Sequence, residues 1–269
     1  MSIITETQLR QLIRESLSRK FNLRAVTNQI YQLIKIHLPK DMLDPRWNYV
    51  HFDWSGGNYA TLTSSTIDSQ KNMTQEMLPD ILATELDNLK LGSIHIEVNA
   101  RHGRYSYNQV EGRFNVSQRA ISIKSFVHVW TPPTEVDDPD ISLDDPEEVA
   151  RHLNRIRGDY DEGKHKEEVQ TQLRKLFETL LHELTHARQA EAGWNAKSVA
   201  FDPDNRVPYL TNPAEVEAWV KAAKEHARNT GNDINVVFKQ ILDNQGVRGA
   251  AQEEVLEKWR QQYALQYVR

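Results

Sequence analysis

The five residues His-Glu-Leu-Thr-His, at positions 182–186, constrain this chain more than any other feature of its sequence. Residues four apart on an α-helix lie one above the other on the same face, so His182 and His186 can direct two imidazole nitrogens at one ion. Glu183 lies one position around the helix, where its carboxylate can reach a water on that ion without being a ligand. The spacing is the H-E-x-x-H pattern, which predicts a zinc site with Glu183 as general base.

The surrounding sequence predicts that the motif lies within one long helix. No proline or glycine interrupts residues 167–192, and Gly193 is a natural helix stop. Apolar residues recur at helical spacing, which indicates one buried stripe: Val169, Leu173, Leu176, Phe177, Leu180, Leu181 and Leu184. A long helix with one buried face is the support that a two-histidine site requires. The alternative is an ordinary helix with two surface histidines that bind nothing.

The sequence restricts the choice of a third ligand. A catalytic zinc usually takes three protein ligands and keeps one position for water. The chain has no cysteine, so the third ligand must be His, Asp or Glu. The residues after His186 lack the Gly and His of the longer H-E-x-x-H-x-x-G-x-x-H motif. Residues 212–219 read Asn-Pro-Ala-Glu-Val-Glu-Ala-Trp, which predicts a second helix with Asn at the N-cap and Pro at its first position.

The pair of histidines followed by a helix with Glu-x-x-Ala resembles the gluzincins, which are zinc peptidases with two histidines and a distal glutamate. The chain is similar in particular to compact gluzincin-like peptidases of bacteria and their phages, over about residues 165–222. The resemblance implies that Glu215 is the third zinc ligand and that Ala218 lets the two helices approach each other. It also implies a zincin-like α+β fold with a twisted, mostly antiparallel sheet, an active-site helix beneath it and a helical C-terminal part.

Glu215 and its neighbours allow other roles. Asn212 and Glu215 have the spacing of a capping box, in which the glutamate would bond the N-cap amide instead of a metal. Glu217 lies close enough along the same helix to be the ligand in place of Glu215. The sequence alone leaves these alternatives open.

Residues around the ligands are expected to orient the imidazoles and to assist catalysis. Many gluzincin-like peptidases carry Asp, Asn or Glu where this chain has Trp219, so another acceptor must orient the imidazoles here. Glu178, one turn before His182, is a candidate, and a salt bridge to Arg174 is its alternative role. Tyr209 is a candidate donor for the oxyanion, or else part of an apolar loop that packs on the core.

Together these residues predict a zinc-dependent endopeptidase that acts on a protein or peptide substrate, with Zn²⁺ as its cofactor, Glu183 as base and Tyr209 as a second catalytic residue. The alternative is a non-catalytic, zinc-stabilised interaction or structural protein, whose N-terminal helix and C-terminal residues 234–268 carry the binding. Residues 8–15, Gln-Leu-Arg-Gln-Leu-Ile-Arg-Glu, resemble leader segments of large-phage proteins, which agrees with a phage-related protein.

Patterning along the chain predicts an N-terminal helical segment at 1–40 and a zincin-like metallopeptidase domain at 41–269. Within the domain we expect a sheet part at 46–131, an acidic loop at 132–147 and a helical part at 148–269. The candidate strands are 49–54, 59–64, 93–100, 105–116 and 119–130, with a helix at 77–91. Zincins place an edge strand before the active helix, and substrate pairs with it as an added strand, so the resemblance implies this role for 119–130.

Charge and hydropathy exclude several classes of partner. The net charge is −5 with both signs mixed, and no block of Lys and Arg is long enough to follow phosphates, so we expect no nucleic-acid partner. No apolar run approaches the roughly 20 residues of a membrane span, so we expect no membrane partner. The N-terminus lacks a basic segment followed by an apolar one, so we expect a cytoplasmic protein.

Overall fold

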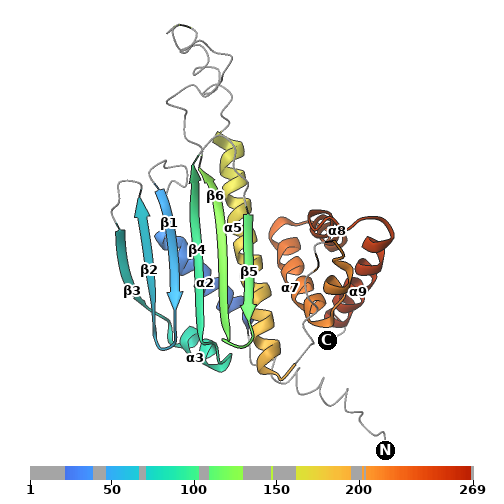
Figure 1. The fold of residues 1–269 in the computed structure, drawn as a ribbon, viewed down its shortest axis with the longest axis horizontal. Helices are drawn as coiled ribbons and strands as arrows, with labels where there is room; N and C mark the ends of the chain where they lie inside the picture. Colours follow the sequence, from blue (N-terminus) through green and yellow to red (C-terminus); the bar gives the residue numbers. More distant parts are fainter. Residues whose placement is uncertain are drawn as a thin grey trace, which may run out of the picture.

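The computed structural model describes residues 22–38, 47–66, 71–102, 109–129, 147, 162–194, 202 and 204–267. Within this part the protein is α+β, with a twisted six-stranded open sheet and a group of C-terminal helices. Figure 1 shows two helices, α2 and α5, against one face of the sheet, and α7, α8 and α9 gathered beside α5. The N-terminal residues 1–21 and, apart from residue 147, the acidic loop expected at 132–147 lie outside the described residues.

The sheet is mixed, with one parallel pair among otherwise antiparallel neighbours. Its strand order is β3-β2-β1-β4-β6-β5, and only the β4–β6 pair is parallel. The strands are β1 (Trp47–Trp54), β2 (Tyr59–Thr66), β3 (Lys71–Met77), β4 (Ser93–His102), β5 (Gln109–Asn115) and β6 (Ala120–Val129). The predicted strands correspond to β1, β2, β4, β5 and β6, because each carries apolar residues on alternate positions.

Strand β3 was not predicted. Its residues are almost all exposed, and polar side chains fill most of its positions, so it has no apolar alternation to detect. It is held by backbone pairing to β2, with Thr63 opposite Met73. The helix predicted at 77–91 is α3 (Asp80–Asn88), which begins after Pro79.

The expectation that residues 119–130 form the edge strand is wrong. β6 lies between β4 and β5, so the edge strand beside α5 is β5. The reason is a hairpin through residues 116–119, which turns the chain back and lets β6 pair in parallel with β4. The composition fits this order, because Ile121, Ile123 and Val127 of β6 are fully buried whereas β5 carries exposed charges.

Helices α2 (Leu23–His37) and α5 (Glu162–Glu191) cover the sheet and share one core with it. Ile30 and Ile34 of α2 lie in the same buried cluster as Phe52 and Ile96 of the sheet and Leu184 of α5. Helix α2 therefore belongs to the same hydrophobic core as the sheet. The domain boundary expected near residue 40 stays a prediction.

The C-terminal helices have a second core of their own. They are α6 (Val207–Leu210), α7 (Pro213–Thr230), α8 (Ile234–Asn244) and α9 (Gly249–Tyr267). Phe238 and Trp259 are fully buried there, and the Trp259 indole N–H donates to the Leu210 carbonyl oxygen at 3.0 Å, which fixes α9 against α6. Among the described residues, no helix combines the length and the apolar character needed to cross a membrane.

Candidate metal centre

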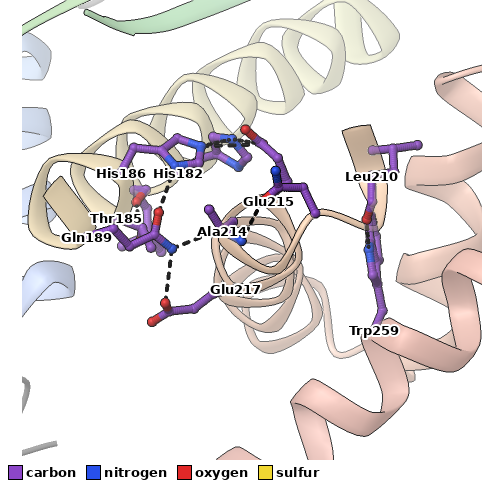
Figure 2. A network of polar contacts seen from close by, with 11 residues as sticks. His182, Thr185, His186, Gln189, Leu210, Ala214, Glu215, Glu217 and Trp259 are labelled. Carbon is purple, nitrogen blue, oxygen red and sulfur yellow. Dashed lines mark hydrogen bonds and ion pairs between the residues drawn. The ribbon is translucent and has the colours of Figure 1, made fainter. Parts of the chain in front are cut away.

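Two histidines and a glutamate converge where α5 meets α7. His182 and His186 lie one turn apart on α5, and their Nε2 atoms are 3.0 Å apart. Oε2 of Glu215, in the first turn of α7, lies 3.4 Å from each of these nitrogens. Among the described residues, these three form the only group whose ligand atoms all lie within 4.8 Å of one another (Figure 2).

This geometry fits a tetrahedral zinc ion. Zinc bonds of about 2.0–2.1 Å place neighbouring ligand atoms of a tetrahedron about 3.3–3.4 Å apart. The two 3.4 Å separations match that spacing and are long for a charge-assisted hydrogen bond, which is about 2.7–2.9 Å, while the 3.0 Å between the two Nε2 atoms is shorter than that spacing. Oε2 of Glu215 is also buried without a hydrogen-bond partner among the described residues. A bound cation would satisfy this oxygen, so the three residues can hold a metal.

The charge state of Glu215 suits a metal ligand. Burial acts to raise the pKa of this carboxyl, but the imidazoles of His182 and His186 outweigh burial and hold the pKa well below its usual range. The carboxylate is therefore ionised at neutral pH and faces Nε2 of both imidazoles.

The alternatives for Glu215 and Glu217 are separated by their contacts. The Asn212 backbone N–H donates to the Tyr209 carbonyl oxygen at 3.1 Å, and the Asn212 side chain accepts from the Ala214 N–H at 2.9 Å. In a capping box the Glu215 carboxylate would accept from the Asn212 N–H, but here the Tyr209 carbonyl oxygen accepts from that N–H instead. Glu217 lies in an ion-pair cluster with Arg188 and Lys221, on a different side of α7 from the imidazoles.

Glu183 lies beside the three ligand residues and is not one of the converging group. Its side chain is almost completely buried, at 6% exposure, between α5 and the edge strand β5. Burial raises the pKa of the Glu183 carboxyl, while both imidazoles and a hydrogen bond from the Phe114 backbone N–H act to lower it. A raised pKa brings a carboxylate closer to the range in which it can take up and release a proton at neutral pH.

Gly112 of β5 is a site residue that the sequence did not identify. A Cβ atom at this position would lie 2.4 Å from Cγ2 of Thr179 and 2.8 Å from Oε1 of Glu183, so no larger residue fits without movement. The absence of a side chain lets β5 run directly against α5 at Glu183. An isolated glycine inside a strand pattern is a known sign of such a close approach, and this was the available signal.

Tyr209 lies at the same site, on the short helix α6 rather than in a loop. Its hydroxyl hydrogen-bonds to the Glu215 side chain. Burial and the two nearby carboxylates, Glu215 and Glu183, raise the pKa of the Tyr209 phenol, so the group stays protonated and acts as a donor.

The two imidazoles are held by different neighbouring side chains. The ring of His182 lies against the indole of Trp219, with 4.6 Å between ring centroids, and its Nδ1 has no hydrogen-bond partner among the described residues. Nδ1 of His186 lies 2.9 Å from Oε1 of Gln189, a residue that the sequence did not identify. Glu178 does not orient His182, because it pairs with Nδ1 of His226 at 2.7 Å.

Comparison with known proteins finds no matching family model, no matching curated protein and no matching solved structure. The assignment therefore depends on the geometry of the site. The protein has a cluster of His182, His186 and Glu215 that can hold a metal ion, with Glu183 and Tyr209 next to it.

Proposed function

We propose that this protein is a zinc-dependent endopeptidase of the gluzincin type. The observation that carries the proposal is the convergence of Nε2 of His182, Nε2 of His186 and Oε2 of Glu215 with a buried glutamate, Glu183, alongside them. A purely structural zinc site needs ligands but no adjacent base, whereas a hydrolytic site needs both.

A zinc ion held by these three residues would activate a water and polarise the carbonyl of the peptide bond. Glu183 accepts the proton of the attacking water and passes it to the leaving amine. Its burial and raised pKa support both halves of this transfer, because the carboxyl must be charged before the attack and protonated after it. Phe114 donates its backbone N–H to Glu183 and holds the carboxylate at the edge of the sheet.

Tyr209 serves as the second catalytic residue in this proposal. Its hydroxyl is next to Glu215, and burial keeps it in the donor form. A protonated hydroxyl beside the metal ligands can stabilise the negative charge that develops on the carbonyl oxygen. To do so it must leave the Glu215 carboxylate, which a bound cation would then satisfy.

The substrate is an extended peptide segment that pairs with β5. This strand lies at the edge of the sheet and pairs with β6 on one side only among the described residues. An extended peptide that adds to an open edge is held by its backbone and thus with little dependence on its sequence. Because Gly112 lets β5 approach Glu183, a peptide on this edge would pass close to the base.

Cleavage of an unfolded protein by the purified, zinc-loaded chain tests the function. We expect hydrolysis that a chelator stops and added zinc restores. Glu183→Gln should keep about one zinc per chain and lose cleavage by about 100-fold or more, since it removes the general base. The matched control is Glu178→Gln on the same helix, whose glutamate pairs with His226 away from the ligands and which should cleave normally.

Two results would contradict the proposal. Cleavage by Glu183→Gln at the wild-type rate would remove the role given to Glu183. A wild-type chain that binds zinc tightly but cleaves no unfolded protein or peptide would instead favour the zinc-stabilised structural protein.

A further inference from the structure

A hydrogen bond to the second ring nitrogen of a metal-binding histidine fixes both the ring and its tautomer. At this site only His186 has such a bond among the described residues, from Nδ1 to the side-chain oxygen of Gln189. Gln189 is itself 5% exposed, so no bulk water competes for its amide. The orientation of this amide therefore decides which proton His186 carries.

The orientation of the Gln189 amide is settled by its other partners. Its nitrogen lies 3.0 Å from the Ala214 carbonyl oxygen and 3.0 Å from Oε2 of Glu217 (Figure 2). A carbonyl oxygen and an ionised carboxylate can only accept hydrogen bonds, so the atom that faces them must be the NH₂ group. The atom that faces His186 is consequently the amide oxygen, which can only accept.

Glu217 is held in its acceptor form. Its carboxylate lies between two cationic side chains that can only donate, Lys221 and Arg188. Lys221 donates to Oε1 of Glu217 at 2.6 Å, and Arg188 donates to the same oxygen. The other oxygen, Oε2, stays available for the Gln189 amide, so the ion-pair cluster keeps that amide in one orientation.

We infer that Gln189 is a positioning residue of the metal centre: its amide oxygen accepts the Nδ1 proton of His186 and leaves the Nε2 lone pair facing Glu215 and the metal. Gln189 thereby replaces the acidic or amide side chain that Trp219 cannot supply. It also joins the two helices, because it contacts His186 on its own helix α5 and Ala214 and Glu217 on α7. The inference depends on the proposed metal site but not on peptide hydrolysis.

Gln189 has two roles: its oxygen accepts the Nδ1 proton of His186, and its NH₂ group joins α5 to α7. Two variants and a matched control separate these roles. Gln189→Met keeps the length of the side chain and removes both roles. Gln189→Glu, made together with Glu217→Gln so that two carboxylates do not face each other, keeps an acceptor for Nδ1 and removes the donor to Ala214. The control is Gln172→Met, since Gln172 is a buried amide on the same helix whose side chain contacts Ser125 at 3.4 Å, away from the site.

Zinc affinity, measured by competition with a chelating indicator, is the first readout. Loss of a partner that orients a ligand costs about 10- to 100-fold in metal affinity, which we expect for Gln189→Met. The double variant Gln189→Glu/Glu217→Gln should bind zinc within about threefold of wild type, and Gln172→Met within about twofold, both small beside that range. Wild-type affinity in folded Gln189→Met would overturn the inference, as would an equal loss in Gln172→Met.

The tautomer of His186 in the metal-free protein is the second readout, and it needs no variant of Gln189. Long-range ¹H–¹⁵N correlation spectra of the wild-type imidazoles, assigned with His186→Gln, should show His186 protonated at Nδ1. Protonation at Nε2 would overturn the inference. If the wild type binds zinc with His186 protonated at Nδ1 but cleaves no peptide, the proposed function fails and the positioning of His186 by Gln189 stands; a wild type that binds no zinc overturns both.

Discussion

Two clusters of histidine and carboxylate side chains in the described part of the chain contrast with each other, and one of these two has the geometry of a metal site. At the contact of α5 with α7, three ligand atoms from His182, His186 and Glu215 face one point. On the face of the sheet opposite the helices, His95 of β4 lies between Asp53 of β1 and Glu97 of β4. The residue types are the same, but the arrangement of donors and acceptors differs.

On the sheet face every hydrogen-bonding position of the imidazole is used. Nδ1 of His95 bonds to Asp53, and its Nε2 bonds to Oε1 of Glu97 at 2.7 Å. Lys124 on the neighbouring strand lies 3.5 Å from the other Glu97 oxygen. The side chains are partly exposed, with 38% for His95 and 47% for Asp53, so water also reaches them. Both nitrogens of this imidazole are thus already paired with carboxylates.

At the metal centre the opposite holds. Nε2 of His182 and Nε2 of His186 converge with Oε2 of Glu215, and this carboxylate oxygen is buried without a hydrogen bond among the described residues. The candidate metal site is thus marked by ligand atoms that converge around a buried carboxylate oxygen with no hydrogen bond of its own among the described residues. The mere number of histidines and acids in a cluster does not distinguish the two.

The largest expected effect is the loss of zinc affinity when one of the three candidate ligands is removed. Glu215→Ala removes one of three ligand atoms, so zinc affinity should fall by more than about 100-fold, beyond what loss of an orienting partner costs. Glu217→Ala should weaken zinc less, because its carboxylate acts through Gln189. Zinc content after dialysis, measured by atomic emission, checks both. Equal zinc in Glu215→Ala and wild type would show that Glu215 is not a ligand.

A pH titration of stability sharpens the contrast between buried and exposed ion pairs. Lys221 and Arg188 lower the pKa of Glu217 to about 2 against the effect of its burial, so the folded state binds that proton less tightly than the unfolded chain, whose glutamates have a pKa of about 4.3. The stabilisation is complete above the unfolded value and is lost as the pH falls from about 4 towards 2, by about 3 kcal/mol.

Urea denaturation at pH 7, 4 and 3 measures this loss, with Glu217→Gln as the reference. The variant lacks the titrating group, so its stability should fall less between pH 4 and 3 than that of wild type. Identical pH profiles for the two proteins would mean that Glu217 gains no stabilisation from Lys221 and Arg188.

The two faces of the sheet should differ in their tolerance of added bulk. Gly112→Val places a side chain against Thr179 and Glu183, so the free energy of unfolding should fall by about 1–3 kcal/mol, and cleavage should fall with it. Ser122→Val adds similar bulk on the exposed opposite face and should change stability by less than about 0.5 kcal/mol. Thermal unfolding of both variants and wild type makes the measurement.

The smallest effect is expected at the cluster on the sheet face. Hydrogen bonds and charges from Glu97 and Asp53 raise the pKa of His95, although burial acts to lower it. Its contribution to stability is therefore complete below the unfolded pKa of about 6.5 and is lost as the pH rises through the folded value. Because these side chains are exposed, His95→Ala should cost no more than about 1 kcal/mol at pH 6 and leave zinc affinity unchanged.

Local patterns predicted the parts of this protein that depend on local geometry. His182, Glu183 and His186 were placed on one helix because a helix repeats every 3.6 residues, and the Asn212 cap with Pro213 marked the start of α7. The sequence could name Glu215 only through a family resemblance, since its approach to the imidazoles depends on how α7 packs on α5.

The sequence could not predict which distant segments of the chain lie next to each other. The position of β6 between β4 and β5 depends on the parallel register of Ile94 with Ile121, which no local pattern encodes. Gly112 is an isolated glycine within a strand pattern, but Glu183, which it approaches on α5, is far along the chain. Gln189 lacked a signal of its own, because an amide on a helix is ordinary until its three partners are known.

The ligands come from helices that belong to different cores, and this has a thermodynamic consequence. His182 and His186 lie on the helix that covers the sheet, whereas Glu215 begins a helix whose Val216 and Val220 pack in the C-terminal core. An ion that needs all three ligands binds only when the two halves are docked, so its binding free energy adds to the docking equilibrium. At a free zinc concentration of 1,000 times the dissociation constant this linkage amounts to about 4 kcal/mol, which zinc would add to the contacts that already dock the two halves.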